Sequence, residues 1–166
     1  MNKFLYLFLL GSITLLFSAC YSFSGISIDP DVRTYYVEQF KDNANNSVPA
    51  LAQIFTEDLK EKIRTESRLI YEETNPDIEF QGSIVDFRVT SEAPQAGETT
   101  ALNRLTIVTS IEYINNRNSD KGWKSNFSFF FDFSSSQDLI SVQDDAVAAI
   151  SAQMMEDIFN KAFTDW

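Results

Sequence analysis

The sequence of 166 residues contains no histidine and only one cysteine. Without histidine, the chain has no Ser-His-Asp triad and no Cys-His pair, and a single cysteine does not supply the ligands of a zinc site. The sequence also lacks a G-x-S-x-G elbow, and its five glycines leave little material for a phosphate-binding loop. No metal site and no cofactor are expected, and any catalysis would depend on carboxylates.

Basic residues are few. Lysine and arginine together number 13 against 24 aspartates and glutamates, which gives a formal net charge of -11 and a pI near 4.3. Nucleic-acid affinity depends on Lys and Arg replacing the counterions of the phosphate backbone, so no nucleic-acid partner is expected. Because 44% of the residues are hydrophobic and 14% are aromatic, the chain has enough apolar surface to form an ordinary folded core.

Residues 1–19 have the layout of a secretory signal. Lys3 precedes an apolar run over residues 4–17, and the small residues at 18–19 precede Cys20. The run is 14 residues long, which is shorter than the roughly 20 residues of a membrane-spanning helix. We therefore predict a cleaved signal peptide at residues 1–19 rather than a transmembrane anchor.

Cleavage before Cys20 would leave the only thiol of the chain at the new N-terminus. Residues 16–20 (LFSAC) resemble the acylation signal of bacterial lipoproteins, with Phe17 where Leu is usual. An ordinary cysteine beside a standard cleavage site is the alternative, but the absence of a partner cysteine favours lipidation. We predict a lipid anchor at Cys20, a tether over residues 20–31, and a location in the periplasm or at an outer membrane.

The first part of the mature chain predicts one strand and one helix. Residues 32–40 are rich in β-branched and aromatic side chains, which favour a strand. The polar residues 41–47 end this strand and supply candidate N-caps ahead of Pro49. Residues 50–65 predict an amphipathic helix, because apolar side chains recur three and four residues apart at Leu51, Ile54, Phe55, Leu59 and Ile63.

Three long strands are predicted at residues 78–90, 102–115 and 123–133. In the first, the apolar alternation changes phase after Ile84, which suggests a bulge or a strand covered on both faces. In the third, one face carries an aromatic ladder that consists of Trp123, Phe127, Phe129, Phe131 and Phe133. This ladder is interpreted mainly as core beneath the helices, and alternatively as an apolar surface that meets acyl chains or a partner.

A second helix is predicted to begin at a capping box formed by residues 141–144. Its apolar stripe continues through Val147, Ile150, Met154, Ile158 and Ala162. The order strand, helix, three strands, helix predicts an α+β domain over residues 32–166. Its two helices would pack on one face of a mixed, roughly four-stranded sheet.

Carboxylates are the only groups left for catalysis, and they do not converge. The adjacent pairs Glu72–Glu73 and Asp144–Asp145 point in different directions on a strand or a helix, so they are interpreted as surface charge. Asp132 lies among aromatic residues, where desolvation could shift its pKa, but alternation places it on the polar face of its strand. We therefore predict no catalytic residue and no enzymatic activity.

Two arginines are candidate ligand-binding residues. Arg88 lies on the polar face of the strand at 78–90, and Arg104 lies near the start of the next strand, outside its apolar alternation. Either guanidinium could bind a phosphate or a carboxylate of a ligand. The favoured alternative is cross-strand ion pairing with one of the many acidic side chains.

Several short segments, taken in their order along the chain, resemble the lipopolysaccharide-assembly lipoprotein family LptE. They are Cys20, residues 21–25 (YSFSG), 80–84 (FQGSI), 103–107 (NRLTI), 129–133 (FFFDF) and 157–160 (DIFN). The resemblance implies an outer-membrane lipoprotein on the periplasmic side, acylated at Cys20 with chains such as palmitate. It also implies a non-catalytic plug and assembly partner of the β-barrel LptD, which helps to deliver lipopolysaccharide to the outer leaflet.

The sequence departs from the better-known branch of this family in two loops. That branch carries basic side chains, linked to lipopolysaccharide contact, in the segments that correspond to residues 91–100 and 134–138. Neither segment contains Lys or Arg here. The resemblance therefore implies the plug role more directly than it implies lipopolysaccharide binding. Removal of residues 1–19 deletes only Lys3 from the charge count and leaves a net charge of -12, for which a barrel lumen would offer compensating basic groups.

Two other functions remain open at this point. One is a periplasmic adaptor lipoprotein of similar topology, such as a secretin pilotin or an activator of cell-wall synthesis. The other is a carboxylate-dependent hydrolase that uses Asp132 or the paired acids. The identity of the partner distinguishes the first alternative, and amide substitutions of the acids distinguish the second.

Overall fold

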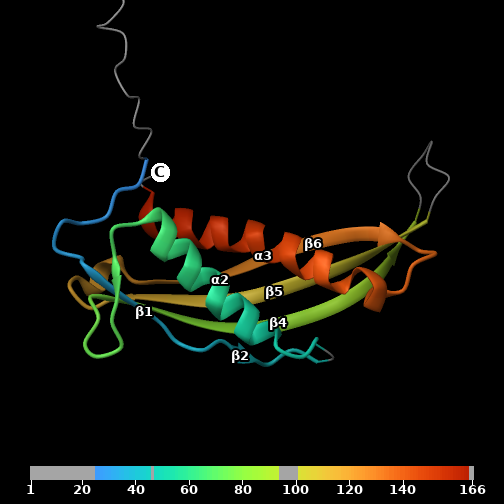
Figure 1. The fold of residues 1–166 in the computed structure, drawn as a ribbon, viewed down its shortest axis with the longest axis horizontal. Coiled ribbons are helices and arrows are strands. Elements are labelled where there is room, and N and C mark those ends of the chain that lie inside the picture. Colours follow the sequence, from blue (N-terminus) through green and yellow to red (C-terminus); the bar gives the residue numbers. More distant parts are fainter. Residues whose placement is uncertain (1–24, 46, 94–100, 165–166) are drawn as a thin grey trace, which may run out of the picture.

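The computed structural model describes residues 25–45, 47–93 and 101–164 (Figure 1). The predicted signal peptide and Cys20 lie outside the described residues, as do residues 94–100. The elements in chain order are β1 (Thr34–Val37), β2 (Lys41–Asp42), α2 (Leu51–Glu66), β3 (Ile70–Tyr71), β4 (Ile78–Glu92), β5 (Leu102–Asn115), the 3-10 helix η1 (Ser119–Lys121), β6 (Trp123–Ser134) and α3 (Leu139–Phe163).

The strands form one mixed sheet in the order β3-β1-β4-β5-β6, with β2 paired to β4 outside this path. β1 runs parallel to β3 and β4, whereas β4, β5 and β6 form an antiparallel meander. The four predicted strands are present as β1, β4, β5 and β6, and β2 and β3 add two residues each. The predicted α+β fold with a mixed sheet is confirmed.

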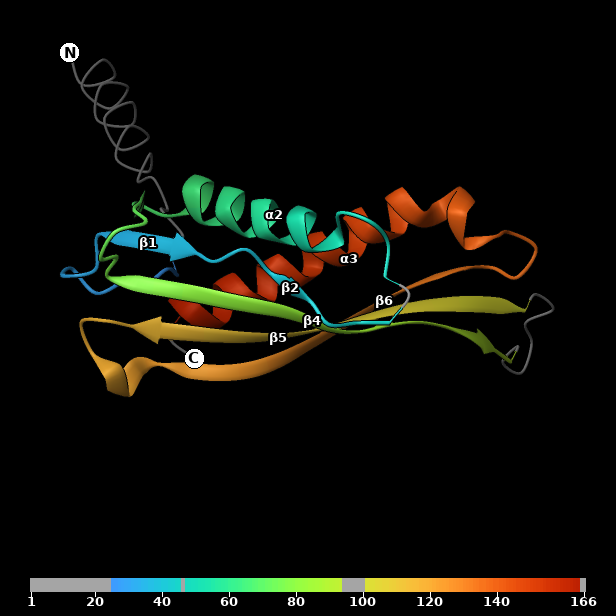
Figure 2. The same ribbon diagram turned by 90° about the horizontal axis from the view of Figure 1, so that it is seen from below.

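Both helices lie on the same face of the sheet (Figure 2). α2 packs on β1, β2, β4 and α3, and α3 packs on β5 and β6. The stripe predicted for the first helix points into the core, except for Ile54, which is 37% exposed. The core also contains Phe80, Ile84, Ile107 and Ile111 of the sheet and Ile150, Met154, Ile158 and Phe163 of α3.

The change of phase predicted in the strand at 78–90 is a β-bulge in β4. The pairing of β4 with β5 shifts between Ile84 and Asp86, so Val85 is the extra residue. Beyond the bulge, Phe87 pairs with Ile107 and points toward the core, while Asp86 pairs with Val108 on the opposite face. The bulge therefore allows both halves of a 15-residue strand to keep an apolar side toward the helices.

The first strand is shorter than predicted. Residues 32–40 were expected to form one strand, but β1 ends at Val37, and β2 begins at Lys41. The physical reason is Phe40, whose side chain is buried and whose amide donates to Thr56 Oγ1 of α2 at 3.0 Å. This contact draws the backbone toward the helix and interrupts the strand.

Both helices begin differently from the prediction. Residues 41–47 do not cap α2: its N-cap is Ala50, in a left-handed conformation without a side-chain cap. Within the polar segment, Asp42 instead accepts from the Ala44 amide and the Ser47 hydroxyl. The capping box predicted at residues 141–144 is also wrong, because Asp138 is the N-cap of α3 and its side chain accepts from the Ser141 amide at 2.8 Å.

Gly82 allows Phe40 to lie against the sheet. A Cβ atom at position 82 would overlap the Phe40 ring, which is 3% exposed. We expect Gly82→Ala to lower the free energy of unfolding by about 1–3 kcal/mol, because overpacking forces a buried ring from its place. Chemical denaturation measures the change, and Gly25→Ala, where a Cβ meets nothing within 4 Å, is the control. Equal stability of both variants would contradict this packing.

Candidate functional site

The face of the sheet opposite the helices, here called the open face, carries the two predicted arginines. Three rungs of side chains cross β4, β5 and β6 on this face. The strand register gives the rungs as Thr90–Arg104–Asp132, Arg88–Thr106–Phe130 and Asp86–Val108–Ser128. All three lie in the half of the meander beyond the bulge of β4.

Arg104 and Asp132 form a two-point ion pair across β5 and β6. The Nε and Nη2 atoms of Arg104 donate to the two carboxylate oxygens of Asp132 at 2.7 and 2.8 Å. The guanidinium also lies 3.9 Å from the centre of the Phe130 ring. The hydrogen bonds and the opposite charges raise the pKa of Arg104 and lower the pKa of Asp132. Both groups are therefore charged at neutral pH.

Arg88 pairs with Asp86 on its own strand rather than across strands. Because Arg88 is opposite Thr106, it is a diagonal neighbour of Arg104 on the same face, and such neighbours lie about 7 Å apart. The structure thus brings the two predicted arginines together. Each arginine has a carboxylate partner, but only Arg104 has the cross-strand partner that the favoured alternative described.

This cluster is poorly suited to acid–base catalysis. A general acid near neutral pH needs a raised carboxyl pKa, whereas the pKa of Asp132 is lowered. Among the described residues, no group of three or more acidic or cysteine side chains has the arrangement of a metal site. An incoming phosphate would compete with Asp86 and Asp132 for the two guanidinium groups.

Sequence reasoning missed two members of the cluster. Asp86 was not recognised as a partner of Arg88, although the two residues lie two apart on one strand and therefore share a face. Phe130 is 53% exposed and lies on the open face. The alternation of β6 was the available signal for Phe130, since the residue has even parity with Ser128 and Asp132.

The aromatic ladder on the helix-facing side of β6 is core, but at its edge. Phe133 is 5% exposed, whereas the other four rings are half-buried and pack against the core cluster. Trp123 stacks on Tyr113 with ring centres 5.6 Å apart. The ladder is therefore chiefly a packing surface beneath α3.

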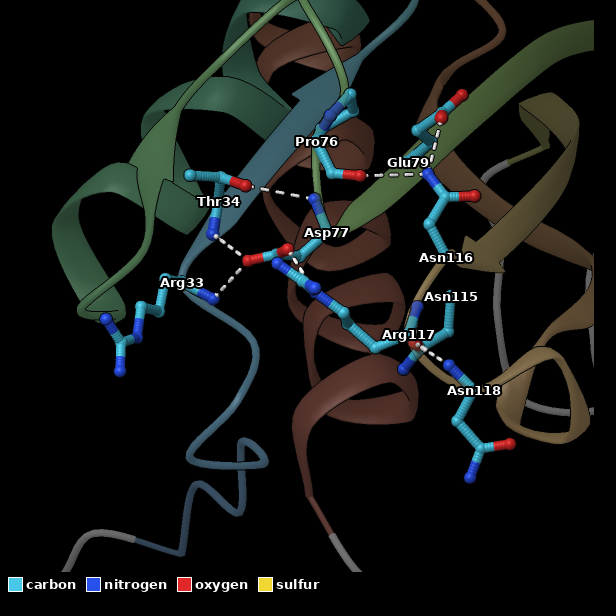
Figure 3. A network of polar contacts seen from close by, with 9 residues as sticks. All are labelled: Arg33, Thr34, Pro76, Asp77, Glu79, Asn115, Asn116, Arg117 and Asn118. Carbon is cyan, nitrogen blue, oxygen red and sulfur yellow. Dashed lines mark hydrogen bonds and ion pairs between the residues drawn. The ribbon is translucent and has the colours of Figure 1, made fainter.

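A polar network around Asp77 joins three segments at the opposite end of the meander (Figure 3). Oδ2 of Asp77 accepts from the amides of Arg33 and Thr34 at 2.8 and 3.1 Å, and Oδ1 accepts from Nε of Arg117 at 2.5 Å. The Asp77 amide in turn donates to Thr34 Oγ1 at 2.9 Å. Burial acts to raise the pKa of Asp77, but these hydrogen bonds and the Arg117 charge outweigh it and lower the pKa.

Comparison with protein families identifies the family of this chain. Residues 32–162 match the LptE family, whose description is lipopolysaccharide-assembly. The chain belongs to this family. LptE membership makes it a lipoprotein of the lipopolysaccharide-assembly type, associated with the cell envelope and with the transport machinery for lipopolysaccharide. The LptE family is a non-catalytic component of that transport.

Solved structures of distant proteins share the LptE-like fold of this chain. The hypothetical protein CT253 from Chlamydia trachomatis is similar with a TM-score of 0.52 and 7% identity, over 79% of this chain and 98% of that one. PelC from Paraburkholderia phytofirmans, solved as a dodecamer, gives a TM-score of 0.51 and 9% identity, over 80% and 90% of the two chains. No curated protein matches the sequence. At these identities the likeness is one of fold.

No helix among the described residues has the length and apolar character needed to cross a membrane. Cys20, the predicted anchor, lies outside the described residues. The first described residues lie beside the end of α3, because the Ser27 amide donates to the Phe163 carbonyl at 2.6 Å. The predicted tether therefore joins the domain at the end opposite the arginine cluster.

Proposed function

We propose that this LptE-family protein is an outer-membrane lipoprotein that plugs and helps to assemble an LptD-type β-barrel during lipopolysaccharide transport. The observation that carries the proposal is the family match over residues 32–162. The role is non-catalytic, and it makes the barrel the principal partner.

The shape of the sheet supports a plug. The meander of β4, β5 and β6 extends far beyond β1, as Figures 1 and 2 show, and its far end forms a projection. On the open face of this projection, the ion pairs of Arg88 and Arg104 neutralise charge, and Phe130 is 53% exposed; Val89, on the helix-facing side, is 43% exposed. A surface of paired charges and isolated apolar side chains suits insertion into a wet protein lumen better than into lipid.

An affinity pull-down of the lipidated chain from solubilised envelopes tests the proposal. A large β-barrel retained near one-to-one after a high-salt wash, together with reduced surface lipopolysaccharide on depletion, is the expected result. A free monomer with normal surface lipopolysaccharide would overturn the proposal. Recovery of a secretin or a cell-wall synthase instead would identify an adaptor lipoprotein.

We propose Cys20 as the acylated residue, in line with its position after a signal-like segment. Cys20→Ala is expected to abolish labelling by a palmitate analogue and to release the protein from membranes, because the acyl chains supply the membrane affinity. Ser18→Thr, two residues upstream, is the control and should retain the label. Continued acylation of Cys20→Ala would refute the assignment.

Arg88 and Arg104 are proposed as contacts for a lipopolysaccharide phosphate. Arg104→Gln is expected to reduce the lipopolysaccharide recovered with the purified complex by about threefold to tenfold, because a charge-assisted hydrogen bond is lost. The matched control is Arg64→Gln, since Arg64 is also exposed and paired with a carboxylate, Glu61 of α2. Equal recovery of lipopolysaccharide with both variants would contradict the assignment of the arginines as lipopolysaccharide contacts.

A further inference from the structure

A pocket of about 300 Å³ lies at the tether end of the domain, far from the arginine cluster. Its walls come from four segments: residues 27–32, the end of β5, residues 121–123 where β6 begins, and residues 161–164 at the end of α3. Ile26 forms a β-bridge with Thr164, which fixes the first segment against the end of the helix. The pocket is thus built from parts that are distant in sequence and held by main-chain contacts.

The pocket holds charges of both signs beside an aromatic pair. The ammonium group of Lys161 lies 5.3 Å from the centre of the Trp123 ring, and Trp123 stacks on Tyr113. Lys121 pairs with Asp29 at 2.8 Å. Within the described part of the chain, no carboxylate pairs with Lys161. Two ammonium groups, one carboxylate and a ring face that already accepts a cation therefore line one small space.

The position of the pocket limits which ligands it meets. Gly25 is five residues after the proposed anchor at Cys20, so the fully extended chain between them spans at most about 18 Å. The pocket opens beside Ile28 and Asp29, immediately after this segment. Acylation of Cys20 would hold it within reach of the lipid headgroups.

We propose that this pocket binds a phosphoethanolamine group. The phosphate would lie between Lys121 and Lys161, and the ligand's ammonium group would face Asp29. The source of such a group as a lipid headgroup rests on the proposed anchor at Cys20. The site is separate from the arginine cluster at the other end of the sheet.

The overall charge of the protein favours this ligand over an anionic lipid. The chain without residues 1–19 has a formal charge of -12 and is repelled by an anionic bilayer surface. A zwitterionic headgroup carries no net charge. Its phosphate group matches the basic side chains of the pocket, and its ammonium group matches the acidic one. Its recognition needs only local complementarity, which the two lysines and Asp29 supply.

Fluorescence of Trp123 measures binding, because Trp123 lines the pocket and the only other tryptophan, Trp166, can be replaced by Phe. The purified full chain, in a maltoside detergent, is titrated with O-phosphoethanolamine, inorganic phosphate or ethanolamine. We expect a saturable change with phosphoethanolamine at concentrations several-fold below those needed for either half of the molecule. No change, or an equal response to phosphate alone, would overturn the proposal.

Lys161→Met is expected to weaken phosphoethanolamine binding about tenfold, as the loss of a charge-assisted hydrogen bond implies. The matched control is Lys60→Met, because Lys60 lies 5.4 Å from the centre of the Tyr71 ring outside this pocket. Equal affinity of the two variants would overturn the site. Circular dichroism establishes that both variants are folded.

Flotation with phosphatidylcholine vesicles, with and without phosphatidylethanolamine, identifies the source of the group. The Cys20→Ala chain is used, so that acyl chains do not contribute. Flotation only with phosphatidylethanolamine supports the site and assigns the lipid headgroup, whereas binding of free phosphoethanolamine alone supports the site and assigns a soluble ligand. Failure of the anchor is detected separately by the labelling of wild-type Cys20.

Discussion

Replacement of Phe80 by Ala is expected to lower the free energy of unfolding by about 3–5 kcal/mol, the range for a fully buried phenylalanine. Phe80 is 0% exposed, and its ring lies 5.2 Å from Tyr113 and 6.1 Å from Phe163. It pairs with Val37 in the register of β1 and β4. The side chain thus connects the parallel and antiparallel parts of the sheet to the end of α3, and its loss leaves a cavity among three elements.

Phe129→Ala provides the comparison within the same protein. Phe129 is half-buried on the edge strand β6 and contacts the core from one side. Its truncation removes less apolar area from burial, so we expect a cost of about 1–2 kcal/mol. Urea denaturation of both variants measures the difference. Equal costs near the upper range would show that the ladder on β6 is as deeply buried as the centre of the sheet.

Replacement of Asp77 by Asn is expected to lower the free energy of unfolding at neutral pH by about 2–3 kcal/mol, because two amides and a guanidinium lose a charged acceptor. The Asp77 side chain is 6% exposed, so water does not readily replace these bonds. The network connects β1, the start of β4 and the turn after β5. Its loss should loosen the end of the sheet that lies nearest to the tether.

The pH dependence of the same contact has a defined sign. The folded-state pKa of Asp77 lies below its ordinary value of 3.8. The stabilisation is therefore complete above about pH 5 and is lost as the pH falls below about 4 toward the folded-state pKa. Between pH 7 and 3, wild type should lose more stability than Asp77→Asn. An equal loss of stability with falling pH in wild type and in Asp77→Asn would show that the carboxylate charge contributes nothing to the free energy of unfolding.

A matched control for Asp77 is Asp29→Asn. Asp29 also pairs with a basic side chain, Lys121, but its side chain is 45% exposed. Exposed ion pairs contribute about 0–1 kcal/mol, so this variant should change stability little. The comparison separates the effect of a buried hydrogen-bonded carboxylate from that of charge removal alone.

Local patterns in the sequence were sufficient for the principal elements. Spacings of three and four identified α2, and two-residue alternation identified β5, β6 and the change of phase in β4, which the sequence left as either a bulge or a strand covered on both faces. These patterns are repeated over 12 to 16 residues, so one discordant residue does not hide them. The start of each helix depends on a single cap, and that is where the predictions at residues 41–47 and 141–144 were wrong.

The candidate site was predictable only in part. The residue types of Arg88 and Arg104 were visible, and so was the excess of acids that could pair with them. The choice of Asp132 as the partner of Arg104 depends on the register of β5 with β6, whereas Asp86 shares a face with Arg88 through two-residue alternation alone. The Asp77 network was not predicted at all, because its members at residues 33, 77 and 117 are separated by about 40 residues and share no local pattern.

The sequence by itself determined the class of this protein: an acidic α+β chain without histidine, preceded by a signal-like segment, with short motifs that resemble LptE. These properties follow from composition and local periodicity, which need no knowledge of distant contacts. Only the tertiary structure decided that Phe40 lies over Gly82, that each arginine on the open face has its own carboxylate, and that Lys121 and Lys161 share a pocket with Trp123. The reason is that packing and strand register bring together residues that are far apart in the sequence. No local sequence pattern shows which of these distant residues will be in contact.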